Sequence, residues 1–282
     1  MKLKRVTSFA TLSGTILLAY LLTACTNTST QSDHQHDHDD SAIKQYNPKI
    51  LNCVGPSGYH VYEADYTCPS NGKKFKALEL GTHSTMGLHL DWQPISYMRF
   101  PVAIPVCPNG FIVDEADIKG TALATRKAYI ESAEYQQLYK QKHASFFLFA
   151  KQSEALKENL DNLWWYYLQA TWEADGCGDH QKYNQYATLV IEKASTEKAK
   201  LTDKDEEYWP MSIIIADMYR RTGQFEMAQQ QLNTIGTPTF EKQKSNDFYL
   251  LAKKVMQLAI DNKSTRAVPI KEMAQKANRE SL

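Results

Sequence analysis

The sequence predicts an α+β protein that is mainly α, with a small irregular β head followed by antiparallel helix pairs. Three features predict this class. Between residues 48 and 115 the chain is rich in β-branched and aromatic residues, and the turn sequences GPSG, SNG and PNG interrupt it. From residue 116 to residue 262 apolar residues recur every three or four positions, which is the helical period. The first 47 residues are expected to lie outside the folded body because they combine a targeting segment with a polar tract.

Residues 1–24 have the pattern of an export signal, in which basic residues precede the apolar run SFATLSGTILLAYLL. The run closes with LTAC, which resembles the lipobox of bacterial lipoproteins. This resemblance implies cleavage before Cys25 and lipid, palmitate included, on that residue. The alternative, a membrane-spanning anchor, needs about 20 apolar residues, and Ser, Thr and Gly interrupt this shorter run. Thr26 stands where inner-membrane retention would favour Asp, so the resemblance implies a lipid-anchored outer-membrane protein that faces the periplasm.

The charge balance argues against nucleic acid as a partner. The chain has 32 basic and 32 acidic side chains. Cleavage before Cys25 would remove Lys2, Lys4 and Arg5, which leaves 29 basic side chains against 32 acidic ones. Because proteins that bind DNA or RNA present a clustered basic face, this slightly acidic balance predicts no such partner.

Residues 25–47 are predicted to form a flexible tether, since TNTSTQSDHQHDHDDS lacks apolar periodicity. His34, His36 and His38 alternate with aspartates in this tract. Neutral imidazoles bind zinc and copper, so the tract could gather such ions loosely. We favour the simpler interpretation of a solvated acidic linker, because a flexible tract has no second shell to orient its ligands.

The remaining cysteines are predicted to form disulfides. Lipid on Cys25 would leave Cys53, Cys68, Cys107 and Cys177, an even number in a compartment that oxidises thiols. Four cysteines allow three pairings, and the spacing does not select one of them.

The head resembles an uncharacterised bacterial family, the domain-of-unknown-function family twenty-two twenty-five. The resemblance rests on YTCPSNGKKF, LGTHSTMGLHLDWQPISY and FPVAIPVCPNGFIVDEADI, with ATWEAD further on. Many members carry two Cys-Pro-x-Cys-Gly knuckles, which together make a closed zinc site, and a helical repeat region follows. This chain keeps Cys68 and Cys107 but has Asn71 and Gly110 near the missing positions. The resemblance therefore implies a degenerate zinc-ribbon-like head in which a Cys68–Cys107 disulfide replaces the metal, and Cys53–Cys177 follows by elimination.

A rebuilt zinc site is the alternative. Cys177 and His180 have Cys-x-x-His spacing and, with Cys68 and Cys107, would complete four ligands. We favour disulfides and expect no cofactor. Three other histidines of this region are expected to be ordinary surface or hydrogen-bonded residues: His60, His83 and His89.

The helical domain, residues 116–262, is expected to contain helices at 121–142, 145–174 and 243–262, followed by a tail over 263–282 that has room for a short helix. SIIIADMYRRTGQFEMAQQQLNTIGTP resembles a tetratricopeptide repeat, in which small and aromatic residues interlock two antiparallel helices. LQATWEADGCGDHQKYNQYATLVIEKA is a looser copy. Trp165 and Tyr166 point away from the expected core face, so they either contact the head, which we favour, or form an exposed surface.

No catalytic signature stands out. The chain has no nucleophile elbow, no His-Glu-x-x-His motif and no phosphate-binding glycine loop. His89 and Asp91 could form an acid–base pair, but we do not favour it. Helix-pair repeats present binding surfaces, so we expect a binding or scaffolding protein with a protein partner. The alternatives are metal binding through the tether and head, and an enzyme of unknown type.

Overall fold

The structure is a computed structural model that describes residues 51, 61–98, 100–114, 118–241, 243–271 and 273. All of them belong to one compact unit, Ile43–Leu282. The predicted signal peptide and the whole of the predicted tether lie outside the described residues. Within the described part of the chain, no helix combines the length and the apolar character needed to cross a membrane.

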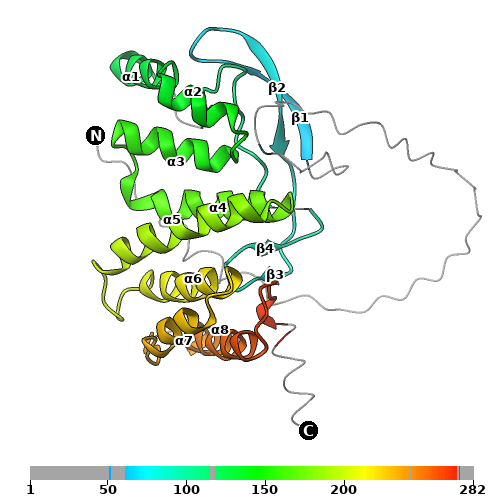
Figure 1. Cartoon of the computed structure of the whole chain (residues 1–282). Coiled ribbons are helices and arrows are strands. Elements are labelled where there is room, and N and C mark those ends of the chain that lie inside the picture. Colours follow the sequence, from blue (N-terminus) through cyan, green and yellow to red (C-terminus); the bar gives the residue numbers. More distant parts are fainter. Residues whose placement is uncertain are drawn as a thin grey trace, which may run out of the picture. The chain divides into compact units, whose positions relative to one another are not determined.

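The fold is α+β and mainly α, as predicted (Figure 1). The head contains two separate antiparallel pairs of strands. β1 (Val61–Thr67) pairs with β2 (Lys74–Leu80), and β3 (Gly87–Leu88) pairs with β4 (Pro94–Ile95). Within residues 100–107, the run FPVAIPVC belongs to no strand and makes one bridge, between Val106 and Ile112. This agrees with its internal prolines, which cannot donate a ladder hydrogen bond.

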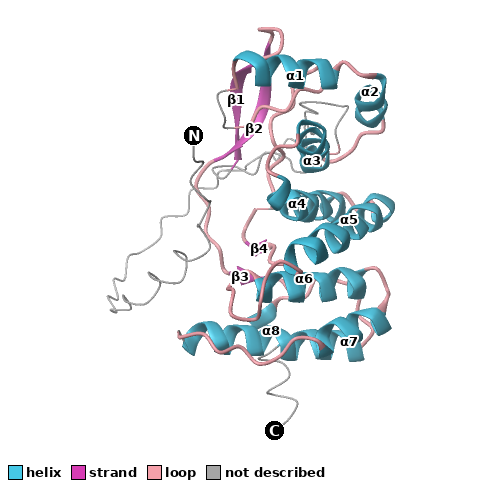
Figure 2. Ribbon diagram, turned by 90° about the vertical axis from the view of Figure 1, so that its left-hand side faces the viewer, coloured by secondary structure: helices cyan, strands magenta, loops and turns pink. Residues whose placement is uncertain are grey.

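The described residues contain eight α-helices and one short 3-10 helix. In chain order they are α1 (Gly120–Ile130), α2 (Ala133–Lys140), α3 (Ser145–Leu156), η1 (Leu160–Asn162), α4 (Leu163–Gly176), α5 (His180–Lys198), α6 (Tyr208–Arg221), α7 (Phe225–Asn233) and α8 (Gln243–Asp261). Consecutive helices pack against one another, most extensively α4 with α5 and α6 with α7. Figure 2 shows them stacked one above another, with β3–β4 beside α6.

Two predicted helices are each interrupted. The segment 121–142 contains α1 and α2, because the Ser132 side chain caps α2 by accepting a hydrogen bond from the Tyr135 amide. The segment 145–174 contains α3 and α4, because Lys157 and Asn159 adopt left-handed conformations between them. Leu160, which follows these two residues, is exposed. The helical period continues across both interruptions, so the pattern alone did not reveal them.

The helix pairs α4–α5 and α6–α7 have equivalent turns. After α4, the Gly178 amide donates to the Asp175 carbonyl and the Asp179 amide donates to the Ala174 carbonyl. The same two bonds follow α6, 45 positions further along the chain, where the Gly223 amide donates to the Arg220 carbonyl and the Gln224 amide donates to the Tyr219 carbonyl. Both glycines have positive φ, which closes each helix in a Schellman motif. The pair resembles a tetratricopeptide unit lengthened beyond the usual length of about 34 residues.

One continuous core unites the head with the helices. It contains Leu90, Trp92, Phe111 and both cysteines of the head disulfide together with buried residues of the helices. A separate satellite core beneath the first hairpin consists of Val61, Leu78 and Met98. The head therefore relies on the helices for most of its buried surface.

Candidate functional site

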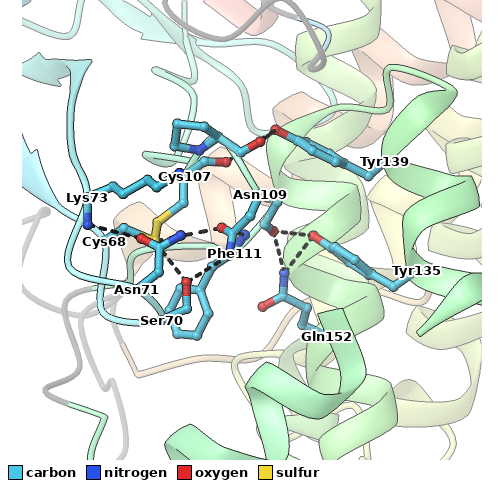
Figure 3. The surroundings of a disulfide bond; sticks show 12 residues. Cys68, Ser70, Asn71, Lys73, Cys107, Asn109, Phe111, Tyr135, Tyr139 and Gln152 are labelled. Carbon is cyan, nitrogen blue, oxygen red and sulfur yellow. Dashed lines mark hydrogen bonds between the residues drawn. A yellow bond between two sulfur atoms is a disulfide. The ribbon is translucent and has the colours of Figure 1, made fainter. Parts of the chain in front are cut away.

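Cys68 and Cys107 are joined by a disulfide, with Cα atoms 5.7 Å apart and both side chains fully buried (Figure 3). Each cysteine begins a tight turn. The Gly72 amide donates to the Cys68 carbonyl at 2.8 Å, and the Gly110 amide donates to the Cys107 carbonyl at 2.8 Å. Both glycines have positive φ, a conformation that glycine adopts without steric cost. A sulfur–sulfur bond thus links the two Cys-Pro turns.

The second turn docks on the helices through its backbone carbonyls. Tyr139 of α2 donates to the Cys107 carbonyl at 3.2 Å, and Tyr135 donates to the Gly110 carbonyl at 2.6 Å. Gln152 of α3 donates to the same Gly110 carbonyl at 3.2 Å and to the Tyr135 hydroxyl at 2.6 Å (Figure 3). Burial raises the pKa of Tyr135, so its phenol stays protonated and can donate. A Cβ at Gly110 would lie 3.0 Å from the Tyr135 ring, so the docking needs glycine there.

The first turn is linked to the second by side chains as well as by the disulfide. Asn109 donates to Ser70 at 2.9 Å, and the Ser70 hydroxyl lies 3.0 Å from the Cys68 sulfur. Asn71, which stands near a missing ligand position, accepts a hydrogen bond from the Lys73 amide. The neighbourhood of the sulfurs therefore consists of hydroxyl and amide groups rather than further thiolates or imidazoles.

The alternative zinc ligands are not assembled in this structure. Cys68 and Cys107 are bonded to each other, and Cys177 is also disulfide-bonded. His180 is the exposed first residue of α5. No cluster of three or more histidine, cysteine or acidic side chains that could hold a metal ion occurs among the described residues. Other predicted sites lie outside them: Cys25, Cys53, His34, His36, His38 and His60. The Cys53–Cys177 pairing stays a prediction.

A second junction between head and helices is built around Arg221, the last residue of α6. Its Nη1 donates to the Asp91 carboxylate at 2.8 Å, and its Nη2 donates to the Asp175 carboxylate at 2.7 Å. The guanidinium lies over the Tyr183 ring, 4.6 Å from its centroid, in a cation–π contact. Burial alone would lower the pKa of Arg221, but the negative groups around it outweigh burial and raise it. The arginine therefore holds together the head, α4, α5 and α6.

The preceding residue, Arg220, binds the chain that follows α8. It pairs with Asp217 at 2.8 Å and donates to the Ser264 carbonyl, and to the Arg266 carbonyl at 2.9 Å. Desolvation raises the pKa of Asp217, and the paired arginine counteracts that effect. Two consecutive arginines thus secure two separate segments at one end of α6.

The head segment at this junction is the tip of the β3–β4 hairpin. The Trp92 amide donates to the His89 carbonyl and the His89 amide donates to the Gln93 carbonyl, both at 3.0 Å. This is a three-residue hairpin loop, in which glycine usually occupies the last, left-handed position. Here that position is Trp92, with φ of 63°, which costs about 1–2 kcal/mol relative to an ordinary conformation. The Trp92 ring compensates by packing against Phe248 and Tyr249 of α8.

The suggested acid–base pair is not formed. Asp91 binds Arg221 and accepts from the Gln93 amide, whereas the ring of His89 lies 3.3 Å from the Gln93 side chain. His83 is exposed and packs edge-on against Phe100. Trp165 packs on Trp164 and Trp172, and Tyr166 packs on Phe149 of α3. Burial, followed by the nearby Asp114 carboxylate of the head, raises the pKa of Tyr166. Both side chains are half-buried, so they do not form a widely exposed surface.

Sequence reasoning missed Arg221 and Tyr183 as partners of Asp91. The signal was present as two consecutive arginines at the end of a largely apolar helix, because a buried charge needs a partner. Asp91 lies in LGTHSTMGLHLDWQPISY and Asp175 ends ATWEAD, and neither motif indicates that the two carboxylates bind the same guanidinium.

The comparisons give no relative of known function: no protein-family model, no curated protein and no solved structure matches the chain. The resemblance to domain-of-unknown-function family twenty-two twenty-five consequently rests on the quoted motifs alone.

Proposed function

We propose that this protein is a lipid-anchored outer-membrane protein whose periplasmic body binds or scaffolds a protein partner through its stacked helix pairs. The observation that carries the proposal is the equivalent geometry of α4–α5 and α6–α7, which share the same turn hydrogen bonds. Stacked helix pairs present extended surfaces, and proteins built from them commonly use those surfaces to hold other proteins. Because a fold alone does not define a function, the proposal depends on the two tests below.

The first test concerns the anchor. The full chain is expressed in a Gram-negative host with an alkyne-labelled fatty acid, and a Cys25→Ser variant is the matched control. We expect label on the wild-type chain, a mass consistent with cleavage before Cys25, and recovery in the outer-membrane fraction. An unlabelled wild-type chain, or a labelled Cys25→Ser chain, would contradict lipid attachment at this residue.

The second test concerns the binding surface. A photo-crosslinking amino acid is placed at exposed Thr188 on α5 and at exposed Gln230 on α7, with exposed Lys73 in the first turn of the head as the control position. We expect both helix positions to crosslink to the same protein in cells, while Lys73 does not. Crosslinks at Lys73 alone would transfer the proposed binding role from the helices to the head.

A further inference from the structure

The tip of the β3–β4 hairpin contacts the helices in the way that a bound peptide contacts its receptor. Leu90 and Asp91 are fully buried, and Trp92 is 8% exposed. The three residues use three kinds of contact. The Leu90 amide donates to the Val268 carbonyl at 3.0 Å, the Asp91 carboxylate binds Arg221, and the Trp92 ring packs on Phe248 and Tyr249.

Residues of four segments distant in sequence form the receiving surface. Arg221 comes from α6, Tyr183 from α5, the aromatic pair from α8, and the Val268 carbonyl from the chain after α8. We name these residues the tip site: Tyr183, Arg221, Phe248, Tyr249 and Val268. The site offers a cation, an aromatic wall and a backbone acceptor, a combination that recognises a carboxylate beside an aromatic side chain.

The hairpin tip does not use the tip site fully. Asp91 reaches one nitrogen of Arg221, and its other oxygen accepts from the Gln93 amide of its own turn. The Nε of Arg221 is buried and has no hydrogen-bond partner within the described residues. This N–H lies on the same edge of the guanidinium as Nη2, which binds Asp175, so it is a further donor that the hairpin tip leaves unused and that an acceptor on an incoming loop could take.

Two features oppose the docked tip. Trp92 holds a left-handed backbone conformation that bulky residues rarely adopt. Asp91 places a carboxylate near the C-terminal ends of α4 and α6, where the helix dipoles disfavour negative charge. Strain of this kind is often retained where one segment must be able to leave a site.

We propose that the tip site recognises a loop of a protein partner that carries a carboxylate followed by an aromatic residue, and that Leu90–Trp92 occupies this site in the free protein. The inference rests on the proposed binding function and specifies the chemistry of its partner. Because the tip is tethered next to the site, its effective concentration is high and a partner must compete with it. Binding of the partner loop would release the β3–β4 hairpin.

The test uses the chain's own sequence as the partner loop. A fluorescent cyclic peptide containing MGLHLDWQPI, residues 86–95, is titrated into the full chain and into an Asp91→Ala/Trp92→Gly variant that cannot fill the site. We expect the variant to bind the peptide at least about tenfold more tightly than the wild type, since no tethered competitor remains. A peptide with the aspartate replaced by asparagine, and the variant with Arg221→Gln added, should both lose binding.

Hydrogen exchange of the wild-type chain gives a second test that does not depend on the variant folding. The Leu90 amide should exchange at least about tenfold faster than the amide of Ile214 in the centre of α6, because releasing the tip requires only local opening. Equal exchange rates would show that the tip leaves only on global unfolding and would overturn the inference. A folded double variant that fails to bind the peptide would also overturn it. Crosslinks from Thr188 and Gln230 would persist in either case, so the broader proposed function is tested separately.

Discussion

Glu173 is one buried side chain that joins two helices and makes the stability of the protein depend on pH. It lies on α4, but it fills the capping position of α3, which has no side-chain cap of its own. Its carboxylate accepts hydrogen bonds from the Ser145 amide at 3.2 Å, the Ser145 hydroxyl at 2.8 Å and the Phe146 amide at 3.0 Å. Burial raises the pKa of Glu173 to about 7, although these three hydrogen bonds act in the opposite direction.

This pKa predicts a pH-dependent stability. The folded state binds the Glu173 proton more tightly than the unfolded state, so the contribution of this group to the free energy of unfolding should rise as the pH falls from 8 towards 5. Near pH 6 the slope from this group is about 1.4 kcal/mol per pH unit, since folding takes up about one proton. In Glu173→Gln that contribution should disappear, as urea unfolding between pH 5 and pH 8 would measure. An unchanged slope would contradict the assignment.

His143 contributes a pH dependence of the opposite sign. Burial, followed by the charge of Lys182, lowers its pKa to about 4. Tyr186 donates to Nδ1 at 2.8 Å, while Nε2 donates to the Gln141 side chain at 3.0 Å, which fixes the neutral tautomer. Because the folded ring stays neutral while the unfolded chain takes up a proton near the ordinary pKa of 6.5, His143 lowers the free energy of unfolding as the pH falls below about 6.5. The contribution of Glu173 is therefore the difference in slope between the wild type and Glu173→Gln.

At the scale of elements, four helices end in the same way. α3, α4, α6 and α8 each close with a left-handed residue whose amide donates three residues back, while the next amide donates five residues back. Glycine fills this position after α4 and α6, but Lys157 and Lys263 fill it after α3 and α8. The turn geometry is therefore shared, although only two of the four turns carry the residue that suits it best.

Substitutions at these turns should change stability in opposite directions. We expect Lys157→Gly and Lys263→Gly each to stabilise the protein by about 0.5–1 kcal/mol, because both side chains are exposed and glycine removes the left-handed penalty. Gly223→Ala should destabilise by about 1 kcal/mol, although no atom lies within 4 Å of the added Cβ. Thermal melts of the three variants would check the signs. A destabilised Lys263→Gly chain would contradict the account.

At the scale of the whole molecule, two junctions between head and helices stand out. The disulfide-linked turns dock on α2 and α3, and the hairpin tip docks on α6 and α8. Each junction has a disulfide-bonded cysteine nearby, since Cys177 follows two positions after Asp175. The disulfide-bonded cysteines therefore lie at the junctions where the head shares its core with the helices.

Removal of the head disulfide should weaken the whole fold. In the chain-entropy model, a crosslink between residues 39 positions apart contributes about 4 kcal/mol to the free energy of unfolding. We expect a Cys68→Ala/Cys107→Ala variant to lose about that amount in urea unfolding, and to expose the 73–114 segment to proteolysis before the helices. If the free energy of unfolding fell by less than about 1 kcal/mol, the hydrogen bond between Tyr135 and Gly110 would be enough to hold the second turn on the helices without the disulfide.

Local chemistry in the sequence was enough to predict the mainly helical class, the turn at Gly110 and an oxidised head. The Cys68–Cys107 pairing followed from a resemblance and is confirmed by the structure. Helical periodicity also placed α8 within one residue of its observed end. These features depend on neighbouring residues or on a recurring motif, both of which are visible in one chain.

Only the tertiary structure decided where the helices break and which buried charges meet. Ser132 and Lys157 interrupt two runs whose apolar period is continuous, because caps and left-handed turns depend on a few hydrogen bonds rather than on periodicity. Arg221 lies 130 positions from Asp91 and 46 from Asp175. No local pattern encodes such a junction, since the burial that makes each charge require a partner exists only after the head has packed on the helices.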